Sequence, residues 1–119
     1  MRWLPMVGLL GLAGLPLWAD AHAHLLDTEP PANAVITQAP TQLRLRFSEP
    51  IEKKFVRLQV KAAERTLVLA PDSMQWDPSA KSMVVPLSLQ ANGVYQVQWS
   101  ILARDGHPGK GHYRFTVKP

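Results

Sequence analysis

The sequence has 119 residues, a formal net charge of +4 and no cysteine. A chain of this length forms one domain with one core. Without cysteine it has neither disulfides nor thiolate chemistry. The charged residues are scattered singly along the chain, which indicates a solvated basic surface rather than a concentrated nucleic-acid site.

Residues 1–21 are predicted to be a cleaved signal peptide. A basic end precedes an apolar run over residues 3–18, which is shorter than the roughly 20 residues that a membrane span needs. Residues 19–21, Ala-Asp-Ala, have the small-x-small pattern of a cleavage site. We therefore expect an exported domain, residues 22–119, in a compartment where nucleic acid is not a normal partner.

Two cleavage positions fit the signal. Cleavage after Ala21 makes His22 the first mature residue, whereas cleavage after Ala23 would expose His24 instead. In either case the mature chain begins with a histidine, whose free amine and imidazole are both metal ligands.

The mature chain has the pattern of an all-β protein. An extended opening segment, residues 25–36, is followed by short runs in which apolar and polar residues alternate, as in half-buried strands. Pro86 lies within one run and indicates a sheet edge or a bulge there. The predicted strands are 42–47, 55–61, 66–70, a short edge piece at 74–76, 83–89, 94–102 and 110–117.

About seven short strands separated by turn signals, with no helical period between them, favour an antiparallel β-sandwich of immunoglobulin-like size. One face of the strand 94–102 carries aromatic and aliphatic residues, and the last strand alternates in the same way. The expected packing centre is Phe47, Trp99, Tyr113 and Phe115.

The loop between the last two strands contains Asp105, Gly106 and His107. A carboxylate and an imidazole two residues apart on such a loop can converge on one point. Joined by the amine and ring of His22, they would form the tetragonal nitrogen and oxygen set that divalent copper prefers. Because a free amine titrates near pH 8, a metal can displace its proton at neutral pH.

Several stretches of the chain resemble the CopC family of periplasmic copper-binding proteins, and particularly its YobA-like branch. In order along the chain they are His22-Ala23-His24-Leu25, Leu45-Arg46-Phe47-Ser48-Glu49, Gly93-Val94-Tyr95-Gln96-Val97-Gln98-Trp99, Asp105-Gly106-His107 and Lys110-Gly111-His112-Tyr113-Arg114-Phe115-Thr116-Val117.

The resemblance implies a Greek-key β-sandwich that binds copper(II) through His22, Asp105 and His107. It also favours cleavage after Ala21. Glu49 matches a family glutamate near the copper and is a candidate for contact with the ligands, with an exposed carboxylate at the end of a strand as the alternative.

His112 is a further candidate near the ligands, with a solvated strand histidine as the alternative. The terminus His22-Ala23-His24 also matches a square-planar copper and nickel motif, which needs two deprotonated backbone amides. That binding mode is not available if residues 23 and 24 are paired into a sheet, because their backbone amides are then occupied.

Some family members have a copper(I) site in a methionine-rich loop, because thioethers suit the soft monovalent ion. The mature chain keeps only Met74 and Met83, and Met83 is expected in the core. We therefore expect no dedicated copper(I) site.

The function expected from these features is a periplasmic, monomeric, non-enzymatic copper(II) carrier for copper resistance or homeostasis. The resemblance implies a CopD-type inner-membrane partner. A histidine-brace copper mono-oxygenase and a metal-free β-sandwich interaction module are the alternatives, and zinc is a further metal for the same ligands.

Overall fold

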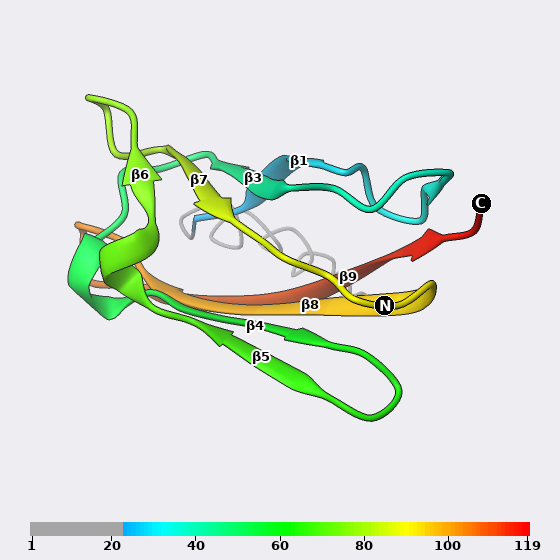
Figure 1. Cartoon of the computed structure of the whole chain (residues 1–119). Coiled ribbons are helices and arrows are strands. Elements are labelled where there is room, and N and C mark those ends of the chain that lie inside the picture. Colours follow the sequence, from blue (N-terminus) through cyan, green and yellow to red (C-terminus); the bar gives the residue numbers. More distant parts are fainter. Residues whose placement is uncertain (1–22) are drawn as a thin grey trace, which may run out of the picture.

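The structure, a computed structural model, describes residues 23–119, which form two β-sheets that face each other (Figure 1). Two short 3-10 turns, Lys53–Phe55 and Pro71–Ser73, lie between strands. The strands are β1 (Leu25–Glu29), β2 (Val35–Ile36), β3 (Gln42–Phe47), β4 (Arg57–Lys61), β5 (Thr66–Leu69), β6 (Gln75–Trp76), β7 (Ser82–Pro86), β8 (Gly93–Leu102) and β9 (Pro108–Val117).

One sheet has four strands in the order β1-β3-β7-β6, and the other has five in the order β2-β9-β8-β4-β5. The chain crosses between the sheets after β1, β2, β3, β5 and β7, so each sheet is built from distant parts of the sequence. All pairings are antiparallel except that of β2 with β9, which is parallel.

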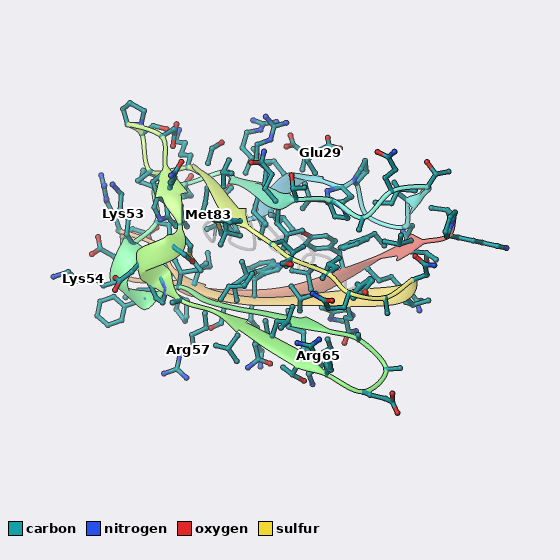
Figure 2. The ribbon with its side chains drawn as sticks, in the orientation of Figure 1. Glu29, Lys53, Lys54, Arg57, Arg65 and Met83 are labelled. Carbon is teal, nitrogen blue, oxygen red and sulfur yellow. The ribbon has the colours of Figure 1, made fainter. Side chains whose placement is uncertain are left out.

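The core lies between the sheets because each strand turns alternate side chains inward. In β3 every second residue is buried, and Phe47 and Phe115 are almost completely shielded from solvent. Figure 2 shows Met83 of β7 pointing into the space between the sheets, and its side chain is fully buried. Burial of these apolar surfaces provides the main stabilisation of a domain without disulfides.

These observations confirm the β-sandwich predicted from the sequence. The seven predicted runs all correspond to strands, with boundaries that differ by a few residues. The predicted packing centre is correct for Phe47, Tyr113 and Phe115, which are buried, whereas Trp99 is only partly buried at its margin. The ring of Trp99 still contacts Phe47 edge-on, at 5.5 Å between ring centroids.

Three local expectations differ from the structure. The opening segment forms two strands, β1 and β2, because its backbone pairs with β3 and β9. Phe55 is not in a strand but in a 3-10 turn, where 59% of it is exposed. The loop after β8 is shorter than predicted, since β9 already begins at Pro108.

Pro86 lies at an open position of the four-stranded sheet, as its sequence context predicted. It is paired with Gln42 of β3 on one side. On the other side β6 pairs only with Met83 and Val84, so Pro86 has no partner strand there. A residue without an N–H group is tolerated at such a position.

The strands β8 and β9 form the longest hairpin and hold the loop that carries the predicted ligands (Figure 1). They are paired without interruption from Gly93 and Val117 to Leu102 and Pro108. This continuous pairing fixes the position of the connecting residues 103–107 at one end of the sandwich. No helix within residues 23–119 is both long and apolar enough to cross a membrane.

Candidate metal centre

The loop between β8 and β9 is a tight turn closed by its own backbone. The N–H of Gly106 donates to the carbonyl of Ala103, and the N–H of Ala103 donates to the carbonyl of His107, both at 2.9 Å. Gly106 has a φ of +95°, which side chains rarely adopt. Glycine at this position therefore allows the turn that brings residues 105 and 107 to the same side.

Asp105 and His107 are neighbours in space. The backbone N–H of His107 donates to Oδ1 of Asp105 at 3.0 Å, as in turns stabilised by an aspartate side chain. The Nδ1 atom of His107 lies 3.2 Å from the same oxygen, and 48% of the His107 side chain and 44% of the Asp105 side chain are exposed. The predicted carboxylate and imidazole thus converge at an accessible position.

The segment 48–52 connects this loop to the beginning of the described chain. The N–H of Arg104 donates to the carbonyl of Pro50 at 3.0 Å. Ile51 is paired with Ala103 in an isolated bridge. Through these contacts the segment holds the base of the loop while its first residue, Ser48, binds the N-terminal part of the chain.

The backbone of His24 is paired with Ser48 in both directions. The N–H of His24 donates to the Oγ of Ser48, and the N–H of Ser48 donates to the carbonyl of His24, each at 2.8 Å. The preceding Ala23 is buried in the core. Its carbonyl oxygen lies 3.6 Å from the position that a Cβ on Gly109 would occupy. The described chain therefore begins beside the first residues of β9.

The other candidate residues have different surroundings. Glu49 is half-buried between Ser48 and Pro50, at the same end of the sandwich as the loop. His112 is exposed on β9, opposite Gln98 of β8. His112 and His24 line a common open groove of about 540 Å³ that is also lined by Trp99.

His22, the third predicted ligand, and residues 1–21, the predicted signal peptide, lie outside the described residues. Within residues 23–119, no group of three or more histidine, cysteine, aspartate or glutamate side chains is arranged to hold a metal ion. Of the predicted ligands, the described part of the chain brings together Asp105 and His107.

Asp77 and Tyr113 have shifted pKa values. Hydrogen bonds lower the pKa of Asp77 to about 2, with the Ser79 hydroxyl as the largest cause and the backbone N–H of Ser82 as the next. Burial raises the pKa of Tyr113. Asp77 fixes the turn before β7 and Tyr113 belongs to the core, so both effects are structural.

The sequence reasoning did not identify the part played by Ser48. Its side chain contacts a residue 24 positions earlier, and no local motif indicates such a contact. Ala23 was likewise not expected in the core. The contact of Ser48 with His24 and the burial of Ala23 become visible only from the pairing of β1 with β3 and the position of β9.

Comparison with known proteins agrees with the fold. A model of the CopC domain matches residues 25–118. Protein YobA of Escherichia coli K12 is 36% identical over 99 residues, which cover 82% of this chain and 80% of YobA. Copper resistance protein C of Escherichia coli is 32% identical over 112 residues, which cover 88% of each chain.

The fold is also shared with a solved structure. The crystal structure of CopC from Methylosinus trichosporium OB3b has a TM-score of 0.72, with 24% identity, and the match covers 82% of this chain and 95% of that one. The similarity extends over nearly all of the described domain. The chain therefore belongs to the CopC family.

Proposed function

We propose that this protein is a periplasmic copper(II) carrier for copper resistance or homeostasis, with the ion held by His22, Asp105 and His107. Membership of the CopC family and the similarity to a copper resistance protein support a role in copper binding. The observation that carries the ligand assignment is the convergence of the Asp105 carboxylate and the His107 imidazole on one accessible turn.

The position of Ala23 supports His22 as the third ligand. Ala23 lies beside Gly109, two residues after His107. A residue bonded to Ala23 has its Cα within about 3.8 Å of that of Ala23. We propose that the amine and ring of His22, which precedes Ala23 in the chain, join the two loop ligands.

The burial of Ala23 supports processing after Ala21. Ala23 is part of the core cluster, with 6% of it exposed. Cleavage after Ala23 would remove this residue and give His24 the free amine, in place of the amide that donates to Ser48. Processing after Ala21 keeps both contacts and supplies His22 as the terminal chelate.

The pairing of His24 argues against the square-planar N-terminal mode. In that mode the amide nitrogen of His24 loses its proton and binds the metal. Here its N–H donates to Ser48 Oγ, and the His24 carbonyl accepts from Ser48. Breaking this pair removes a hydrogen bond that anchors the chain, so coordination by Asp105 and His107 is favoured.

A carrier without turnover fits this site better than the alternative of a histidine-brace mono-oxygenase. Tyr113 and Phe115 are buried in the core and so do not form an aromatic substrate surface. A bound Asp105 would also occupy a position that oxygen needs. The metal-free interaction module leaves the convergence of Asp105 and His107 without a role.

Copper(II) is preferred over zinc because it binds such nitrogen and oxygen sites more tightly in the divalent series. We propose no dedicated copper(I) site, since Met74 and Met83 are both buried in the core. We also propose that the protein is a monomer and that it exchanges copper with a CopD-type inner-membrane protein.

The decisive experiment compares the mature protein beginning at His22 with the same protein carrying one extra N-terminal methionine. The extra residue converts the amine into an amide, which no longer binds copper in the same way. Changes outside the ligands typically cost about 10–100-fold in metal affinity, so loss of the chelate should exceed about 100-fold. The control carries the extra methionine after Pro119.

Copper(II) titration followed by electron paramagnetic resonance provides the readout. Asp105→Asn and His107→Ala should weaken binding, whereas the matched change Asp72→Asn, in the exposed turn before β6, should not. Equal affinity with and without the N-terminal methionine would contradict the proposal. So would a copper signal that survives His107→Ala and is lost when His24 is changed.

A further inference from the structure

The outer face of the five-stranded sheet carries positively charged side chains in register. Residues of β4, β8 and β9 lie directly opposite one another, and alternate residues of each strand are buried, so the remaining ones point away from the core. Figure 2 shows Arg57 projecting from this side of the sheet. We call the following three rows the basic face: Arg57-Ser100-Lys110, Gln59-Gln98-His112 and Lys61-Gln96-Arg114.

The charges of the basic face are not neutralised locally. Its three rows contain neither aspartate nor glutamate, and within residues 23–119 none of its arginines and lysines forms a salt bridge. Two arginines outside the basic face are paired with carboxylates: Arg46 with Asp27, and Arg104 with Glu52. Four cations without counter-charges create a positive potential that attracts an anionic partner.

The first two rows also form a groove of about 540 Å³. Arg57, Lys110 and His112 contribute charge or polarity to it, and Trp99 and Gly111 provide an apolar part. The glutamine and serine side chains add donors and acceptors for hydrogen bonds. Such a groove fits an extended peptide better than it fits the flat surface of a partner.

We propose that the basic face binds an extended acidic segment of a partner protein, with carboxylates on alternate residues. Lys110, His112 and Arg114 follow one another at every second position of β9, which spaces them by about 6.6 Å. An extended peptide spaces its own alternate side chains by the same distance. A segment lying along β9 can therefore pair each alternate carboxylate with one of these three side chains.

An anionic membrane surface fits the basic face less well. Proteins that lie on membranes insert aromatic or long aliphatic side chains between the lipids. The aliphatic side chains exposed on strands of this sheet, Val35, Val68 and Val94, are short and lie on three different strands, β2, β5 and β8. The cations instead surround a groove with hydrogen-bonding side chains, which suits a polar peptide.

The test measures binding of a fluorescent peptide of 10 residues, the length of β9, in which glutamate and threonine alternate. A second peptide has the same composition with its glutamates in one block. The mature protein is compared with the triple variant Arg57→Gln/Lys110→Gln/Arg114→Gln. The control, Lys53→Gln/Lys54→Gln/Lys81→Gln, loses the same charge, and Figure 2 shows Lys53 and Lys54 at one end of the sandwich.

We expect the alternating peptide to bind more tightly than the blocked one at about 20 mM salt, and both to weaken at about 200 mM salt. The basic-face variant should lose about tenfold in affinity, as expected for three exposed ion pairs, while the control stays within about twofold of the unchanged protein. Copper(II) titration of both variants shows whether the domain is intact. Because copper binding and peptide binding are measured separately, failure of the peptide test leaves the copper proposal unaffected.

Three outcomes would overturn the inference. The first is equal loss of binding in the two triple variants, which would show a non-specific charge effect. The second is absence of peptide binding at low salt. The third is tighter binding to vesicles of anionic phosphatidylglycerol than to the alternating peptide, with the same dependence on Arg57, Lys110 and Arg114.

Discussion

At the scale of single residues, Ser48 and Gly106 hold the backbone near the proposed ligands although neither is itself a proposed ligand. Gly106 adopts the positive φ that closes the Asp105–His107 turn. Ser48 fixes the backbone of His24 with its hydroxyl and its own N–H. Both residues therefore fix the backbone around the proposed copper site.

Replacing Ser48 by alanine should change how copper is coordinated. The substitution removes the acceptor for the His24 N–H, at a cost of about 0.5–1.5 kcal/mol. Deprotonation of this amide becomes easier, so the square-planar N-terminal mode should replace the proposed one at a lower pH. Electron paramagnetic resonance and visible absorption over an alkaline pH series of the copper(II) protein measure this change.

The control is Ser73→Ala, whose hydroxyl donates to the carbonyl of Ala70 in a separate turn. It should leave the pH series unchanged. A Ser48→Ala protein with the same pH series as the unchanged protein would show that the His24–Ser48 pair does not decide the coordination mode.

At the scale of elements, the β8–β9 hairpin depends on glycine where an aromatic ring crosses it. Trp99 of β8 lies opposite Gly111 of β9. A Cβ added to Gly111 would lie 2.6 Å from Cζ2 of Trp99, which is much too close. At Gly109, in contrast, the nearest atoms are 3.5 Å away, an ordinary contact with Ile101.

Gly111→Ala should therefore destabilise the domain, while Gly109→Ala should not. Displacement of the Trp99 ring from its place beside Phe47 is an overpacking effect that typically costs about 1–3 kcal/mol. The matched change at Gly109 removes freedom from the unfolded chain and should be neutral or slightly stabilising. Urea unfolding followed by tryptophan fluorescence distinguishes the two, and equal stabilities would refute this account of Gly111.

At the scale of the whole molecule, the proposed copper site joins the two sheets. Its N-terminal ligand precedes β1 of the four-stranded sheet, and its loop ligands belong to the β8–β9 hairpin of the five-stranded sheet. Unfolding separates these parts of the chain. Copper should therefore bind the folded protein far more tightly than the unfolded one.

Copper(II) is consequently expected to raise the stability of the mature protein. A free concentration of about 100 times the dissociation constant should add about 2.7 kcal/mol to the free energy of unfolding. For a domain of this size the melting temperature should rise by roughly 10 °C or more. His107→Ala should abolish the increase, and removal of copper by a chelator should reverse it in the unchanged protein. An equal rise in both would place the stabilising ion elsewhere.

The sequence by itself determined the fold class and the approximate positions of β3 to β9, because local patterns such as residues 42–47 and 94–102 alternate between apolar and polar residues. It also predicted that Asp105 and His107 converge, since both belong to one short turn whose glycine permits this arrangement. These features depend on neighbours in the chain, and local chemistry is sufficient to predict them.

Only the tertiary structure revealed the contact of His24 with Ser48, the burial of Ala23 beside Gly109, and the parallel pairing of β2 with β9. It alone aligned Arg57, Lys110 and the other side chains of the basic face into rows. Each of these depends on strands distant in sequence meeting in a particular register. That register is decided by the packing of the whole core and by strand pairing, not by any local pattern.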